Sequence, residues 1–182
     1  MIDQSGSAAP RVERPSSLRP GSQWFGPITG AEGNTISIID IDRARLGLAG
    51  GEAARVRVGT DSGEARPFTV SWTPDGKRIV VANFRTNNLS VVDLDRALAH
   101  LAGAEIARIP LTRADGNPAR PKRTAVTSDG RYAVVTGGAN TLPDPAPSGT
   151  VFVIDLRTNS QVATVTGVGI DPYNLTLVED DD

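Results

Sequence analysis

Residues 66–83 read RPFTVSWTPDGKRIVVAN, and residues 120–137 read RPKRTAVTSDGRYAVVTG. The two stretches align without a gap, so that a proline, an Asp-Gly pair and two consecutive valines recur at the same places. A third, shorter copy, PYNLTLVED, begins at Pro172. Self-similarity at a period of about 50 residues indicates stacked copies of one supersecondary unit.

The first copy has the signature of a tight hairpin. In TPDG (73–76) the proline presets φ for the first central turn position, and the glycine takes the left-handed position that closes the turn. Before the turn, Phe68, Val70 and Trp72 alternate with polar residues, which is the period of a strand. After it, RIVVAN is nearly continuously apolar, as expected for a strand that is covered on both faces.

A second segment repeats between these hairpins. NTISIIDIDRARLGLAGGEAARV (34–56) and NNLSVVDLDRALAHLAGAEIARI (87–109) are identical at about half of their positions, and 149–165 is a looser third version. Each predicts two strands joined by a short Ala/Leu-rich helical turn, with Asp42 and Asp95 as the N-caps. The best copy therefore predicts four strands, at 67–73, 78–84, 88–94 and 105–111.

The composition limits the class of protein to which the chain can belong. The 182 residues include 38% hydrophobic residues, 19 Gly and 13 Pro, which suits an all-β domain with many turns. We predict a disordered lead or linker at 1–23 and one structured domain at 24–182. The lead has no apolar segment typical of a signal peptide, and no apolar run reaches the roughly 20 residues that span a membrane. The net charge of −2 does not favour nucleic acid as a partner.

The repeat resembles a known family. The order of the TPDG turn, the strand VVAN (80–83), the strand NNLSVVD (87–93) and the strand end Ile109-Pro110 resembles the YVTN-type β-propeller repeat of surface-layer-like, YncE-like and lactonase-like proteins. The resemblance covers about 24–182. It implies a partial β-propeller of about three four-stranded blades, twelve strands in all, with short helical turns in the connections from third to fourth strand. The remaining strands are then expected at 24–29, 35–40, 54–58 and 172–179.

Three blades are too few to close a ring, which usually needs at least four. Three alternatives remain open at this point. The chain is a fragment whose remaining blades lie in a longer parent chain, or two copies form a homodimer that closes a six-bladed ring, or the sheets form an open stack.

Most residues that could carry chemistry have a simpler interpretation. His100 lies in a connecting run and is expected to be exposed or packed on the helical turn. Asp40, Asp93 and Asp155 recur at the end of each third strand, so they are expected to bind backbone amides rather than to catalyse a reaction. The chain has no cysteine, and no phosphate-binding or nucleophile motif occurs. The sequence therefore predicts no catalytic residue, no metal and no cofactor.

One cluster favours ligand binding. In propellers of this type, the loops that enter the first strand and leave the second strand share one rim of the central channel. Arginine and asparagine on such a rim can bind carboxylates or phosphates through paired N–H donors. The predicted ligand-binding residues are Arg66, Asn83, Arg85, Arg120, Lys122, Arg123 and Asn140, with Asn87 and Arg113 on the same rim.

Two other interpretations of this rim stay open. It can be a solvated charged surface, or Arg66 and Arg120 can be structural, each pairing with an aspartate of the neighbouring blade. The insertion GGANTLPDPAPSGT (137–150) is expected to overhang the channel.

The sequence thus predicts a non-catalytic binding or scaffold module that engages a protein or a small anionic ligand at its basic rim. The alternative, implied by the resemblance to lactonase-like propellers, is a hydrolase that acts on an acidic lactone with catalytic groups outside this segment. The resemblance also implies a periplasmic or cell-surface location.

Overall fold

The computed structural model describes residues 28–30, 33–138 and 148–178, and in these residues the chain is all-β, as predicted. Sheet A contains β1 (Ile28–Gly30), β2 (Thr35–Ile39) and β3 (Glu52–Arg57), with the helix α1 (Ile41–Arg45) before β3. Sheet B contains β4 (Pro67–Trp72), β5 (Arg78–Asn83), β6 (Asn88–Asp93) and β7 (Glu105–Pro110), with α2 (Leu94–Leu98) before β7. Sheet C contains β8 (Pro121–Val126), β9 (Tyr132–Gly137), β10 (Ser148–Asp155) and β11 (Ser160–Ile170).

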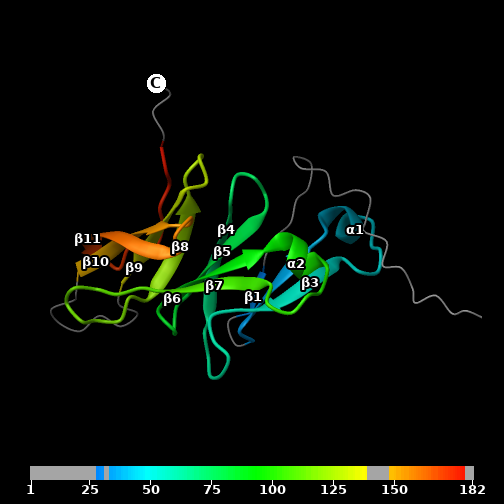
Figure 1. Ribbon diagram of the computed structural model, residues 1–182, viewed down its shortest axis with the longest axis horizontal. Helices are drawn as coiled ribbons and strands as arrows, with labels where there is room; N and C mark the ends of the chain where they lie inside the picture. Colours follow the sequence, from blue (N-terminus) through cyan, green and yellow to red (C-terminus); the bar gives the residue numbers. More distant parts are fainter. Residues whose placement is uncertain (1–27, 31–32, 139–147, 179–182) are drawn as a thin grey trace, which may run out of the picture.

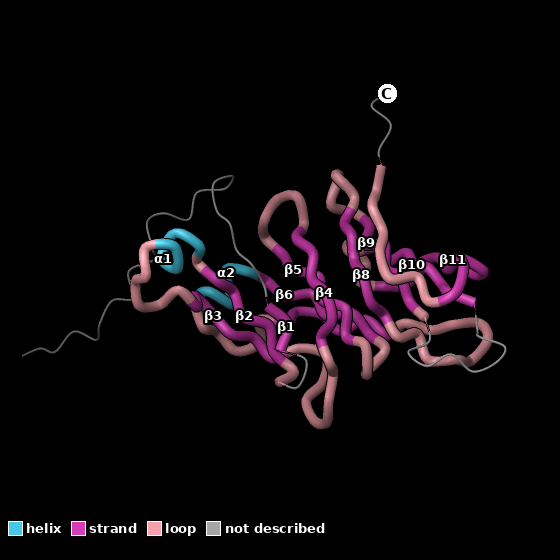
Figure 2. Tube along the Cα trace, turned by 180° about the vertical axis from the view of Figure 1, so that it is seen from behind, coloured by secondary structure: helices cyan, strands magenta, loops and turns pink. Residues whose placement is uncertain are grey.

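The three sheets lie side by side in the order A, B, C, which we call the row (Figure 1). The same order is visible from behind, with β4 and β8 next to each other (Figure 2). Side chains of β4 connect these two first strands: Thr69 Oγ1 donates to the carbonyl of Lys122 at 2.5 Å, and Ser71 Oγ donates to the carbonyl of Thr124 at 2.7 Å. Neither helix in the described part of the chain is long and apolar enough to cross a membrane.

The predicted β-propeller is wrong. The described strands number eleven rather than twelve, because 172–178 form no strand, and no described strand of sheet A pairs with a strand of sheet C. The described residues therefore form an open row of three separate sheets and not a propeller of four-stranded blades. The six-bladed homodimer loses its basis together with the blades. The predicted short helical turns are confirmed as α1 and α2.

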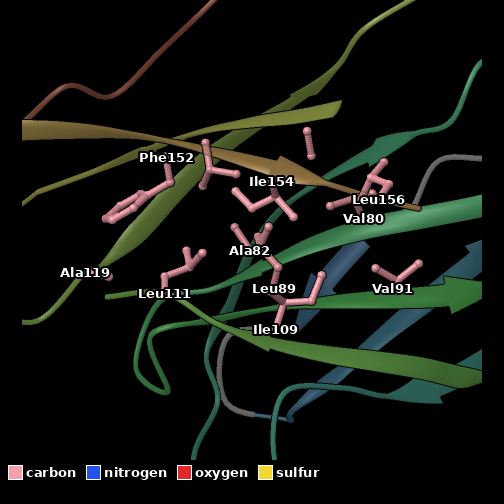
Figure 3. Close-up of a cluster of buried hydrophobic side chains, with 12 residues drawn as sticks. Val80, Ala82, Leu89, Val91, Ile109, Leu111, Ala119, Phe152, Ile154 and Leu156 are labelled. Atoms are coloured by element: carbon pink, nitrogen blue, oxygen red, sulfur yellow. The ribbon is translucent and has the colours of Figure 1, made fainter. Parts of the chain in front are cut away.

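Burial explains why the middle sheet is apolar on both faces. We call the face of each sheet that points toward the sheet C end of the row its forward face, and the opposite face its rear face. Between sheets B and C, Val80, Leu89 and Val91 of the forward face of B pack with Phe152 and Ile154 of the rear face of C (Figure 3). A second cluster fills the junction of sheets A and B, with residues Ile36, Ile38, Ala54, Val56, Val58, Ile79, Val81, Val92, Ala97 and Ala104. As predicted, β5 is buried along nearly its whole length.

The two hairpin turns have the same structure, which confirms the repeat. Gly76 and Gly130 have φ values of 67° and 69°. The carboxylate of Asp75 accepts a hydrogen bond from Thr73 Oγ1 at 2.6 Å. Asp129 accepts one from Thr127 Oγ1 at 2.5 Å. Each aspartate therefore stabilises its own turn through this hydrogen bond.

These turns give the stability of the fold a pH dependence. The hydrogen bond from Thr73 lowers the pKa of Asp75 below its ordinary value of 3.8, and the bond from Thr127 lowers that of Asp129. A lowered pKa in the folded state contributes stability that is present above the unfolded-state value and is lost as the pH falls through the folded-state value. We therefore expect the free energy of unfolding to fall less steeply below about pH 4 in Asp75→Asn/Asp129→Asn than in the parent.

Urea unfolding at a series of pH values from about 6 to 3 measures this slope. Leu101→Ala, which shortens an exposed apolar side chain and removes no carboxylate, is the control and should keep the parent slope. Equal slopes in the turn variant and the parent would show that the two turns do not carry the effect.

The helix caps differ by two residues from the prediction. Asp40 caps α1 by accepting from the N–H of Arg43 at 3.0 Å, and Asp93 caps α2 by accepting from the N–H of Arg96 at 2.8 Å. The predicted caps, Asp42 and Asp95, lie inside the first turn instead. Asp155 similarly accepts from the N–H of Arg157 at 2.8 Å. The backbone-binding role predicted for Asp40, Asp93 and Asp155 is confirmed.

Candidate anion-binding site

Three of the predicted cations meet at one aromatic ring. Phe84 directly follows β5 and is 1% exposed. Its ring centroid lies 5.6 Å from Cζ of Arg66, 5.0 Å from Cζ of Arg120 and 6.0 Å from Nζ of Lys122. Each distance is within the range in which a cation is attracted to the face of an aromatic ring. We call this group, together with the rings of Phe68 and Tyr173, the Phe84 cluster.

The two further rings extend the aromatic surface of the cluster. The centroid of Phe68 lies 5.7 Å from that of Phe84 and 5.9 Å from that of Tyr173, the latter in an edge-on arrangement. Nζ of Lys122 lies 4.3 Å from the centroid of Tyr173, so the lysine stands between two rings. Aromatic pairs of this geometry are worth about 0.5–1.5 kcal/mol beyond the area that they bury.

The backbone holds the two arginines in an uncommon conformation. Arg66 and Arg120 have φ values of 53° and 47°, in the left-handed region that non-glycine residues rarely adopt, and each directly precedes a proline. Hydrogen bonds fix both: the carbonyl of Arg66 accepts from the N–H of Phe84 at 3.0 Å, and the N–H of Arg120 donates to Oδ1 of Asn87 at 2.9 Å. The direction in which each arginine side chain leaves the backbone is therefore set by the fold.

The charges of the cluster are not balanced. Lys122 is 0% exposed, and its Nζ pairs with the carboxylate of Asp171. Arg66 and Arg120 are half-buried, and no carboxylate in the described part of the chain pairs with either guanidinium. The alternative in which both pair with a neighbouring aspartate is therefore not observed. Two guanidinium groups remain uncompensated beside one ring.

Three other predicted residues do not join the cluster. Arg85 is exposed and pairs with Glu64 at 2.5 Å. Arg123 is exposed, and its backbone N–H donates to Thr136 Oγ1 at 3.2 Å. Asn140 and most of the insertion lie outside the described residues.

Arg113, on the predicted rim, is buried and pairs with Asp115 at 2.6 Å. This hydrogen-bonded pair holds the pKa of Asp115 well below its usual range. Its charge is therefore neutralised within its own loop.

Asn83 has a structural role in the junction of sheets A and B. Its Nδ2 donates to Asn88 Oδ1 at 2.8 Å and to Ser90 Oγ at 2.7 Å, and Asn88 Nδ2 donates to the carbonyl of Gly59 at 2.9 Å. A Cβ on Gly59, whose φ is 79°, would lie 2.6 Å from Cγ of Asn83. The loop can approach this closely only because residue 59 is glycine.

The aromatic residues and Asp171 were not predicted as part of the site. The sequence alignment of the repeat contained the necessary signal, because it places Tyr173 on Phe68 and hence Asp171 on Arg66. The prediction selected polar side chains on loops and did not consider the rings that orient them.

Comparisons with known proteins show the fold only. No protein family matches the chain, and no curated protein matches it. The hydrazine synthase of Kuenenia stuttgartiensis is similar in structure, with a TM-score of 0.58 and 21% sequence identity over 78% of this chain. This chain spans about a third (34%) of the length of that one. A functionally unknown protein from Desulfotomaculum acetoxidans DSM 771 matches with a TM-score of 0.45 and 23% identity, over 81% of this chain and 40% of the other.

Proposed function

We propose that the chain is a binding module that holds a small anionic ligand, bearing carboxylate or phosphate groups, at the Phe84 cluster. The observation that carries the proposal is the pair of half-buried guanidinium groups, Arg66 and Arg120, which lie against one buried ring and have no carboxylate partner among the described residues. A charge that is partly removed from water is stabilised by an anion.

The geometry suits recognition of an anion. A guanidinium that stacks on a ring uses its face for the ring and keeps its edge N–H groups for a planar or tetrahedral anion. Because Arg66 and Arg120 lie against the same ring, one ligand can meet both. Lys122 contributes little free charge, since Asp171 pairs with it.

The alternatives have less support. No group of three or more metal-ligating side chains gathers in residues 28–30, 33–138 and 148–178. No observation in this part of the chain bears on the hydrolase alternative, which stays a prediction, as do the YVTN-type resemblance and the exported location that it implies.

Titration with citrate and with inorganic phosphate, at constant ionic strength, tests the proposal by calorimetry and by 1H–15N spectra. We expect saturable binding of at least one probe, with shifts of the Arg66 and Arg120 side-chain signals. In Arg66→Gln/Arg120→Gln the dissociation constant should rise by at least about 100-fold, because two charge-assisted hydrogen bonds are lost and each contributes about 1.5–3 kcal/mol.

Arg131→Gln is the matched control. Arg131 also stacks on a ring, with its Cζ 4.7 Å from the centroid of Tyr132, but it lies after the second hairpin turn and outside the cluster. Its removal should leave the affinity unchanged. Equal affinities in the double variant and the parent, or the absence of saturable binding to both probes, would contradict the proposed function.

A further inference from the structure

The two end sheets of the row, A and C, each have one face that no described sheet covers. At each internal junction, the forward face of one sheet packs on the rear face of the next. The forward face of sheet C and the rear face of sheet A have no such neighbour among the described residues. The repeat makes it possible to compare each free face with its buried equivalent, residue by residue.

The forward face of sheet C copies the buried forward face of sheet B. In sheet B, Leu89 pairs with Ile109 across β6 and β7, and in sheet C, Val151 pairs with Val165 across β10 and β11. Leu89 and Ile109 are 0% and 2% exposed, whereas Val165 is 51% exposed and Val151 is half-buried. Val134 and Val153 are likewise half-buried, although their equivalents Val80 and Val91 are both 0% exposed.

A polar contact accompanies the apolar one at both internal junctions. At the junction of A and B, the N–H of Gly59 donates to Oε1 of Glu105 at 2.8 Å. At the junction of B and C, the N–H of Thr112 donates to Oε1 of Gln161 at 2.9 Å, and Gln161 Nε2 returns a bond to the carbonyl of Thr112. The donor lies in the loop after the last strand of a sheet, β3 or β7. The acceptor lies near the start of the last strand of the following sheet, β7 or β11.

Sheet A has the acceptor for the same contact, already assembled. In sheet B, Glu105 is held by Arg108 and accepts from Ser90 Oγ. In sheet A, Arg55 Nε donates to Glu52 at 2.8 Å.

Hydrogen bonds from Arg55 and then from Ser37 lower the pKa of Glu52. The trio Glu52, Arg55 and Ser37 occupies the positions of Glu105, Arg108 and Ser90 in the repeat. No described loop binds it.

We propose that two copies of this chain associate head to tail, with the rear face of sheet A of one copy on the forward face of sheet C of the other. The interface would cover the valine face of sheet C, and Glu52 of sheet A would accept a hydrogen bond from the other copy, as Glu105 accepts one at the junction of sheets A and B. Such a contact is heterologous, because the two copies contribute different surfaces. Burial of the half-exposed valines supplies the driving force. The proposal does not depend on the proposed ligand.

Sedimentation velocity of the full chain over a range of concentrations tests this association. The parent should show a concentration-dependent species larger than the monomer. Val153→Asp places a charge on the forward face of C, and Glu52→Lys reverses the acceptor on A, so each variant alone should be monomeric. An equimolar mixture of the two should form a 1:1 dimer, because each supplies the intact face that the other lacks.

Ile106→Asp is the matched control. Ile106 is an exposed apolar residue, 43% exposed, in the last strand of the middle sheet. This change should leave the association unchanged. A parent that stays monomeric at every concentration would overturn the proposal, as would a mixture of the two variants that stays monomeric. Circular dichroism of each variant confirms that it remains folded.

Discussion

Replacing Phe152 with alanine is expected to lower the free energy of unfolding by about 3–5 kcal/mol, the usual range for removing a buried phenylalanine. Phe152 lies in β10, is 0% exposed and belongs to the cluster between sheets B and C, at the end of the cluster where Ala119 and Leu111 lie (Figure 3). No described residue of sheet A belongs to this cluster, so the loss falls on one junction. Urea unfolding followed by circular dichroism measures the change.

The neighbouring backbone cannot relax into the resulting cavity without losing its own contacts. A Cβ on Gly137 would lie 2.7 Å from Cε2 of Phe152 and 2.2 Å from the carbonyl oxygen of Ala119, which shows how closely the chain surrounds the ring. Leu101→Ala, at a residue that is 55% exposed, is the control and should change stability by less than about 0.5 kcal/mol. A similar small change for Phe152→Ala would show that this junction does not stabilise the fold.

Replacing Asp171 with alanine is expected to cost about 3 kcal/mol, because it leaves the ammonium of Lys122 buried without a counter-charge. The ring of Tyr173 still faces the ammonium at 4.3 Å and limits the cost. The same unfolding measurement provides the value.

A second variant separates charge from packing. In Lys122→Met/Asp171→Ala no buried charge remains, and the long apolar side chain fills most of the space of the lysine. The double variant should therefore recover most of the stability lost in Asp171→Ala. An equal loss in both variants would mean that Asp171 acts through its backbone position or its packing rather than through the ion pair.

The sequence predicted the local structure closely. The hairpin expected at 67–73 and 78–84 is observed as β4 (Pro67–Trp72) and β5 (Arg78–Asn83), and its copy at 120–137 has the same turn. These elements could be predicted because turn chemistry and strand alternation act over a few residues. Their arrangement depends instead on contacts between sheets.

The strand predicted at 172–179 is not observed in the described residues, and it shows what hydrophobic periodicity cannot predict. PYNLTLVED alternates as a strand does, but alternation describes only which side chains share a face. A strand also needs a neighbour for its N–H and C=O groups, and no described strand pairs with 172–178. The number of strands and the closure of the sheets could not be predicted from periodicity.

The candidate site was predicted in part. Arg66, Arg120 and Lys122 converge as predicted, whereas Asn83 and Arg85 belong to other contacts. The sequence pointed to cationic residues that the structure brings together before or within β4 and β8, but it could not show which of them had internal partners. Partners such as Glu64 for Arg85 are distant in the sequence and recur in no pattern.

Three residues directly precede the proline that recurs in each copy of the repeat. Arg66, Arg120 and Asp171 share the same backbone angle, with φ values of 53°, 47° and 53°, although their side chains differ in size and in sign of charge. The backbone at this position of the repeat therefore has the same φ whether the residue is a basic arginine or an acidic aspartate. For protein engineering, Arg66 and Arg120 are the two positions of this kind at which the side chain can be exchanged, because neither guanidinium has a carboxylate partner among the described residues, whereas Asp171 is tied to the buried Lys122.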